Sequence, residues 1–157
     1  RYVVLDLRDN SGGLLQEAIE VASYFLRDVP IAYERTSTEE RALMAMSSSP
    51  MIDLPLVVLV NSGSASAAEL VAAALQDHRR AVLVGQVTYG KGSVQQVFRL
   101  SDGSSAHITT AEWLTPLRHQ IAEIGITPDF EVSDEDNNSA DEYINAAISI
   151  LMREESE

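Results

Sequence analysis

Two short stretches of the sequence contain residue types that could carry out nucleophilic chemistry. The first is Asn61-Ser62-Gly63-Ser64-Ala65-Ser66-Ala67-Ala68-Glu69, and the second is Tyr89-Gly90-Lys91-Gly92-Ser93. A serine hydroxyl needs a base before it can attack, and a lysine can be that base when burial lowers its pKa. No Asp or Glu lies between Val87 and Leu100 to pair with Lys91. A serine of the first stretch and Lys91 are therefore the candidate nucleophile and base.

The elements around the first stretch would place its serines well. The apolar run Leu56–Val60 precedes it and predicts a buried strand, and a helical pattern follows from Glu69 to His78. A turn from a strand into a helix exposes side chains and offers the unpaired N–H groups of the helix start. Each stretch alone is also typical of a helix cap or a glycine turn, and the glycine spacing fits neither nucleotide-binding fingerprint.

The three histidines are weaker candidates for the base. His78 comes at the far end of the helix, His107 alternates with apolar residues in a strand pattern, and His119 follows Pro116 in a polar turn. None has a local partner arrangement. The two glycines around Lys91, in contrast, allow a tight turn and a close approach to a neighbouring element.

Taken together, four segments resemble the core of the carboxyl-terminal processing (tail-specific) serine proteases. They are the two stretches above, with the second extended to Val84–Gln95, and two further segments, Leu5–Gly13 near the start and Gly125–Asp129 near the end. The resemblance implies that Ser66 is the nucleophile, that Lys91, 25 residues later, is the general base, and that Gln95 orients the lysine. It also implies an oxyanion hole made by the N–H of Ala67 and that of Gly12 or Gly13, with Gly12 favoured.

The same resemblance implies properties of the whole protein. The fold would be an α/β crotonase/ClpP-like protease core with a mixed sheet and crossover helices. The enzyme would be a serine endopeptidase that needs no metal or other cofactor and cleaves proteins near unstructured, apolar C-terminal tails. We interpret residues 1–157 as a fragment whose PDZ domain would precede Arg1, and the place of action would be outside the cytoplasm, in the periplasm or cell envelope.

Composition sets broad limits on the function. The chain has 157 residues, 45% of them hydrophobic, which predicts one globular domain. Its formal net charge of −13 argues against nucleic acid or an anionic membrane surface as a partner. It has no cysteine, so a thiolate nucleophile and a disulfide framework are excluded.

The rest of the chain predicts the elements that support the site. We expect strands and helices at 2–7, 14–26, 30–34, 81–84, 126–132 and 139–153, and an antiparallel hairpin of 94–100 with 106–114. The polar segment 36–53 is a possible lid or excursion with a short helix near Glu39–Met46, and 133–138 is an acidic linker. Ser139 and Glu142 form a capping-box pattern, and Asp6 and Arg8 are expected to form a structural ion pair.

Two other functions share this scaffold. One is a non-catalytic ligand-binding module, and the presence of Ser66, Lys91 and Gln95 together argues against it. The other is an acyl-CoA enzyme of the crotonase type, and the acidic balance and lack of a basic cluster argue against that.

Overall fold

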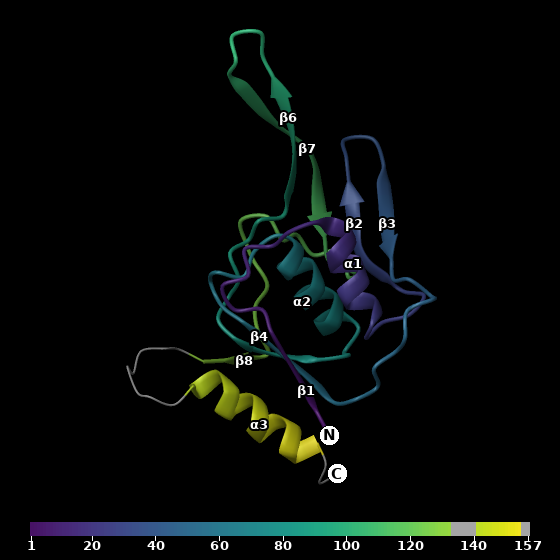
Figure 1. Ribbon diagram of the computed structural model, residues 1–157, viewed down its shortest axis with the longest axis vertical. Helices are drawn as coiled ribbons and strands as arrows, with labels where there is room; N and C mark the ends of the chain where they lie inside the picture. The colour runs from purple at the N-terminus through teal and green to yellow at the C-terminus, as the bar shows by residue number, and fades with distance from the viewer. Residues whose placement is uncertain (133–140, 155–157) are drawn as a thin grey trace.

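The computed structural model describes residues 1–132 and 141–154, and its strands form two four-stranded sheets (Figure 1). The first is parallel and has the order β1 (Val3–Asp6), β4 (Leu56–Val60), β5 (Val82–Gly85), β8 (Phe130–Glu131). The second is antiparallel and has the order β3 (Glu40–Met44), β2 (Pro30–Arg35), β7 (Ser105–Leu114), β6 (Ser93–Arg99).

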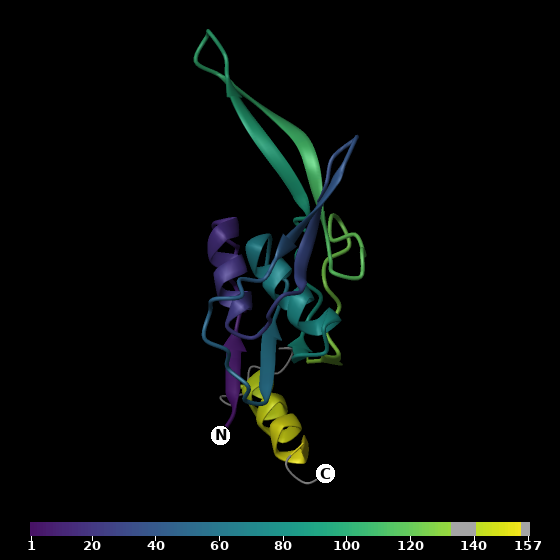
Figure 2. The ribbon, with the colours of Figure 1, turned by 90° about the vertical axis from the view of Figure 1, so that its right-hand side faces the viewer.

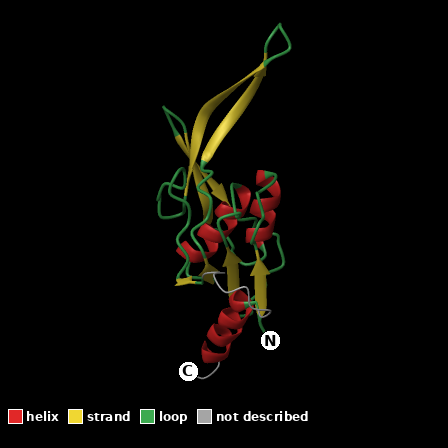
Figure 3. Cartoon of the chain, turned by 90° about the vertical axis from the view of Figure 1, so that its left-hand side faces the viewer, coloured by secondary structure: helices red, strands yellow, loops and turns green. Residues whose placement is uncertain are grey.

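Helices cover both faces of the parallel sheet (Figures 2 and 3). Side chains of β4 alternate between the two faces. Val58 and Val60 join the core cluster of α1 (Leu15–Ser23) and α2 (Ala67–Asp77), whereas Val57 and Leu59 pack with α3 (Glu142–Glu154). All five residues of β4 are therefore buried, as a continuous apolar run predicts.

Helix α2 occupies the centre of the fold. Its residues from Ala67 to Leu75 are all buried, and it contacts α1, β2 and β5. A helix that is apolar on all sides must be enclosed. Helix α2 is thus held between the two sheets, in contact with β5 of the first and β2 of the second.

The outer part of the second sheet is a two-stranded ribbon that projects away from the rest of the molecule (Figures 1 and 2). We call residues 95–109 the β6–β7 arm. Gln95 to Arg99 are all exposed, and among the described residues β6 pairs only with β7. The turn closes with the Leu100 N–H donating to the Ser104 carbonyl at 2.9 Å, so the predicted hairpin is confirmed.

The predicted α/β class with crossover helices is confirmed, with the parallel and antiparallel strands divided between two sheets. The short helix expected near Glu39–Met46 is wrong, because Glu40–Met44 is strand β3. A short isolated helix is unstable, whereas pairing with β2 satisfies the backbone of β3 and buries Leu43. Whether 36–53 acts as a lid stays a prediction.

The C-terminal helix is present, but its described start differs from the expected one. It begins at Glu142, and Asp141 caps it by accepting the Ile144 N–H at 3.1 Å. The predicted acidic linker 133–138 and Ser139 lie outside the described residues. Among the helices of the described part, none is both long and apolar enough to cross a membrane.

Candidate active site

Ser66 is the N-cap residue of α2, on the sharp turn that follows β4. Its φ of 56° and ψ of −119° are unusual for a residue with a side chain. Such strain is typical of a serine held on a strand-to-helix turn, with its hydroxyl directed outward. Ser66 is only half-buried, so its hydroxyl can reach a substrate.

Ser64, two residues earlier, has a different role. It is fully buried, and its hydroxyl donates to the Leu7 carbonyl at 2.7 Å. The Asn61 N–H in turn donates to Ser64 Oγ at 3.0 Å. Ser64 therefore joins the end of β1 to the turn that bears Ser66, which leaves Ser66 as the better placed of these two serines for chemistry.

Glu69 links the two candidate catalytic stretches. Its carboxylate is fully buried in the first turn of α2. Oε2 accepts the backbone N–H of Ser66 and that of Lys91, each at 2.8 Å. Oε1 accepts the Gly90 N–H at 2.7 Å and the Thr88 hydroxyl. Four donors satisfy the acceptor sites of one carboxylate and offset the cost of burying it.

This shared carboxylate fixes how close the two stretches are. Two backbone nitrogens that are each 2.8 Å from the same oxygen can be no farther apart than twice that distance. The backbones of Ser66 and Lys91 are therefore neighbours, as the predicted pairing requires. The roles of Glu69 and Thr88 were missed from sequence, although Ser66 followed three residues later by Glu69 is a capping-box signal.

The loop that holds Lys91 depends on its flanking glycines. A Cβ on Gly92 would lie 2.4 Å from the Ala122 backbone nitrogen, and Gly90 has a φ of +84°. The close approach predicted for these glycines is therefore present. The Lys91 side chain is exposed, however, and within the described residues it makes no hydrogen bond or ion pair.

The backbones of Ser66 and Lys91 thus lie side by side, but no hydrogen bond within the described residues joins their side chains. No hydrogen bond between Ser66 Oγ and Lys91 Nζ, or between Lys91 and Gln95, occurs in the described part of the chain. Gln95 is exposed on β6. The expected desolvation of Lys91 is not observed, because the residue is exposed.

Gly12 lies directly against the turn that bears Ser66. A Cβ there would be 2.8 Å from Ser66 Cβ and 3.0 Å from the Ala67 nitrogen, and φ is +98°. Only glycine allows this approach. The Gly12 N–H donates to Asn10 Oδ1 at 3.0 Å, whereas the N–H groups of Gly13 and Ala67 have no hydrogen-bond partner among the described residues.

A small apolar pocket of about 140 Å³ opens beside these amides. It lies between the first turns of α1 and α2, and its walls include Gly12, Gly13, Leu14, Ala67, Ala68 and Val71. An apolar side chain next to a scissile bond could enter it.

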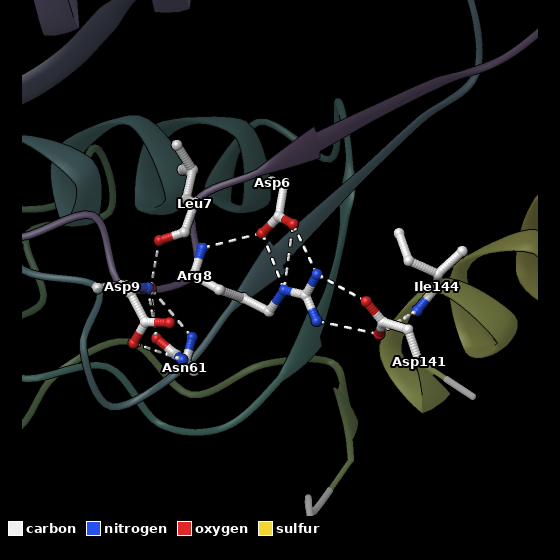
Figure 4. A network of polar contacts seen from close by, with 8 residues as sticks. Asp6, Leu7, Arg8, Asp9, Asn61, Asp141 and Ile144 are labelled. Carbon is white, nitrogen blue, oxygen red and sulfur yellow. Dashed lines mark hydrogen bonds and ion pairs between the residues drawn. The ribbon is translucent and has the colours of Figure 1, made fainter. Parts of the chain in front are cut away.

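The loop after β1 is also tied to α3 (Figure 4). Arg8 forms ion pairs with Asp6 at 2.7 Å and Asp141 at 2.8 Å, and its guanidinium lies 5.0 Å from the centre of the Tyr143 ring. The hydrogen bonds from Arg8 hold the pKa of both carboxyl groups below their usual value. The expected structural pair of Asp6 and Arg8 is present, and sequence reasoning missed Asp141 as its third member.

The three histidines are not part of this site. His78 follows the last turn of α2, and its Nε2 contacts the Pro30 carbonyl at 2.7 Å. His107 is on the arm and His119 is exposed near the end of β7. None forms a hydrogen bond with Ser66 within the described residues.

Comparison with known proteins gives the same class. The model of peptidase family S41 matches residues 1–132, so the chain belongs to this family of serine peptidases, as its motifs predicted. The match ends before α3.

The relatives and a solved structure agree with that assignment. The chain is 44% identical to a carboxyl-terminal-processing protease of Synechocystis, over 94% of this chain and 36% of the relative. It is 48% identical to the chloroplastic carboxyl-terminal-processing peptidase 2 of Arabidopsis thaliana, over 80% and 25%. The structure of the photosystem II D1 C-terminal processing protease aligns with a TM-score of 0.78 and 38% identity, over 90% of this chain and 37% of that one.

The curated relatives are longer than this chain. The chain spans about a third of the length of the curated relatives that it matches over most of its length. The similarity to these relatives favours a proteolytic function over a non-catalytic binding module, because the relatives are processing proteases by name.

Proposed function

We propose that this chain is the catalytic core of a serine endopeptidase that uses Ser66 as nucleophile and Lys91 as general base. The observation that supports this most directly is the buried Glu69 carboxylate, which holds the backbone N–H of both residues. A buried carboxylate with this arrangement keeps the two loops in one position relative to each other, which is what two groups that share a proton require.

The reaction would follow the usual course of acyl transfer. Neutral Lys91 takes the proton from Ser66 Oγ, and Oγ attacks the scissile carbonyl. The N–H of Ala67 and that of Gly12 or Gly13 hold the oxyanion. The protonated lysine passes its proton to the leaving amine. Lys91 then activates a water that releases the acid from Ser66.

The arrangement of the lysine corresponds to a resting state in this proposal. Because its backbone is already held next to that of Ser66, rotation of its flexible side chain is the motion that would complete the dyad. Gln95 would orient the lysine once it turns inward. A bound substrate that covers Lys91 would also exclude water from around its side chain.

The second oxyanion donor depends on Asn10. The Gly12 N–H can serve only after Asn10 Oδ1 releases it, whereas the Gly13 N–H needs no such change. We therefore keep both glycines as candidates, with Gly12 the one that contacts the turn that bears Ser66.

For the whole protein, we propose substrates with unstructured, apolar C-terminal tails. The small apolar pocket beside Ser66 supports a preference for short apolar side chains near the cleaved bond. A PDZ domain elsewhere in the protein would capture the tail, and the protein would act outside the cytoplasm, in the periplasm or cell envelope.

The test is cleavage of an unstructured peptide with an apolar C-terminus, followed by mass spectrometry. Ser66→Ala and Lys91→Ala should each abolish turnover and leave the circular dichroism spectrum unchanged. Ser62→Ala, on an exposed residue of the same turn, is the matched control and should cleave normally. Cleavage by either active-site variant at the rate of this control would exclude the assignment.

A further inference from the structure

The β6–β7 arm is an amphipathic ribbon. Residues that pair across two strands share a face, and neighbours along a strand alternate. Phe98 pairs with Ala106 and Gln96 pairs with Ile108, so these residues and Leu100 belong to one mostly apolar face. Phe98, Leu100 and Ile108 are each 41% to 51% exposed. In the described residues, no other element covers this face.

One edge of the arm has unpaired backbone groups. Hydrogen-bonded and non-bonded pairs alternate along an antiparallel ladder. Because the Leu100 N–H bonds the Ser104 carbonyl, the backbone groups of Phe98 and Gln96 point inward to β7. Those of Gln95, Val97 and Arg99 therefore point outward, along the free edge of β6.

The two edge strands of this sheet, β3 and β6, differ in how well charged side chains guard them against pairing with another strand. Natural sheets blunt an exposed edge with charged side chains. On β3, Glu40 and Arg41 form ion pairs with Arg118 and Glu34. The β6 sequence Ser93–Arg99 has one charged residue, Arg99, which forms no ion pair among the described residues. The free edge of β6 is thus open to pairing.

The open edge leads directly to the candidate active site. β6 begins two residues after Lys91, and Gln95 lies on the outward-facing row. On the other side of the ribbon, the β7 edge is occupied at its base by β2, which pairs with Glu112, Trp113 and Leu114. An extended chain that passes Ser66 could therefore continue along β6 and not along β7.

We propose that β6 binds an extended segment of the protein substrate, which adds to the antiparallel sheet as a fifth strand. This inference rests on the proposed protease function and specifies how the substrate is held. Backbone pairing is indifferent to sequence, and it suits an unstructured segment that has no fold of its own. The added strand places alternate side chains beside Phe98 and Leu100, so the arm favours substrates in which every second residue is apolar.

Charge supports an unfolded polypeptide as the occupant. The chain has a net charge of −13, yet Asp102 is the only acidic residue between Ser93 and Ala111. A substrate segment on the arm is therefore not repelled by carboxylates. Arg99 offers a cation near the tip for acidic groups of the substrate.

Val97 and His107 provide a matched pair of variants. They face each other in a non-bonded pair, so the N–H of each points away from the ribbon, toward opposite edges. Proline at either position removes one outward N–H and none of the ladder bonds. Val97→Pro should block pairing at the β6 edge, and His107→Pro should disturb the hairpin equally while leaving that edge intact.

The experiment measures binding in a Ser66→Ala background, separately from cleavage by the parent chain. The probe is a fluorescein-labelled peptide in which valine and serine alternate before an Ala-Ala C-terminus. We expect Val97→Pro to weaken binding roughly tenfold, as the loss of one or two strand hydrogen bonds predicts, and His107→Pro to change it less than twofold. Equal affinities of the two proline variants, or no binding of the peptide by the Ser66→Ala chain without a proline, would overturn the proposal.

Amide hydrogen exchange gives a second measurement that needs no proline. With the peptide bound, the amides of Gln95, Val97 and Arg99 should gain protection, while those of Gln96 and Phe98 should change little. Protection on the β7 edge instead would also overturn the proposal. If the Ser66→Ala chain binds the peptide with this protection pattern but also cleaves it as fast as the parent chain does, the catalytic assignment fails and the binding mode stands.

Discussion

The nucleophile side and the base side of the candidate site are built differently. Ser66 sits between two buried elements, and its turn is tied to Leu7 and Asn61 through the buried Ser64. Lys91 and Gln95 lie where the chain enters an exposed ribbon. Under the proposed mechanism, this difference means that the nucleophile is held in place before substrate arrives, whereas the base depends on contacts that the substrate can supply.

Glu69 is the point at which the two sides meet, so changing it should have the largest effect. Glu69→Gln replaces one acceptor oxygen with an NH2 group that faces backbone donors. We expect a loss of on the order of 3 kcal/mol in unfolding free energy, because buried N–H groups become unpaired. We also expect kcat to fall roughly 100-fold, because the two loops lose their common position.

Urea unfolding and peptide cleavage would measure these two effects. Glu20→Gln, on the exposed side of α1, is the control for the loss of one charge and should behave as the parent does. If Glu69→Gln retained both stability and kcat, the carboxylate would have no role in joining the two sides.

Substitutions in the buried strand β4 and in the exposed β6–β7 arm should also differ in their cost to the free energy of unfolding. Val58 in β4 is fully buried and Val97 in the arm is 54% exposed. Val58→Ala should cost about 2 to 3 kcal/mol through lost burial and a cavity, and Val97→Ala should change stability by less than about 0.5 kcal/mol. Chemical denaturation of both variants checks this, and equal costs would mean that the arm is packed against the core.

The sequence predicted the nucleophile side better than the base side, for a physical reason. Ser66 depends on a local pattern, an apolar strand run followed by a helix, and such patterns persist in the fold. The surroundings of Lys91 depend on segments far away in the sequence, such as Ala122, so its exposure could not be predicted. The same limit explains Glu40–Met44, which became a strand because β2 lies beside it, and the Asp141 partner of Arg8.

Loss of the link between α3 and the loop after β1 should have a smaller effect on stability. Two variants of Asp141 can separate its ionic contribution from its capping contribution. Asp141→Asn keeps the helix cap, because Asn and Asp cap equally well, and removes the charge that Arg8 binds. The pair is partly exposed, so we expect a cost of about 0.5 kcal/mol. Asp141→Ala loses the cap as well and should cost about 1.5 kcal/mol. Thermal unfolding in low and high salt checks both values, and a salt-independent cost of Asp141→Asn would contradict an ionic origin.

Acidification should remove the ionic part of that link. Arg8 lowers the pKa of Asp6 and of Asp141 from an ordinary value of 3.8. A carboxyl group whose pKa is lower in the folded state stabilises the fold fully above the unfolded value, and this contribution is lost as pH falls through the folded value. The stability difference between the parent and Asp141→Asn should therefore be constant above about pH 5 and should shrink toward zero by about pH 2. Urea unfolding at a series of pH values measures it. A difference that persisted in acid would contradict an ionic origin, because a protonated Asp141 and an Asn both cap the helix without charge. The absence of any difference across the whole pH series would instead mean that Asp141 holds α3 through its cap alone, and that the loop bearing Gly12 is fixed by Asn61 and Ser64 without help from the helix.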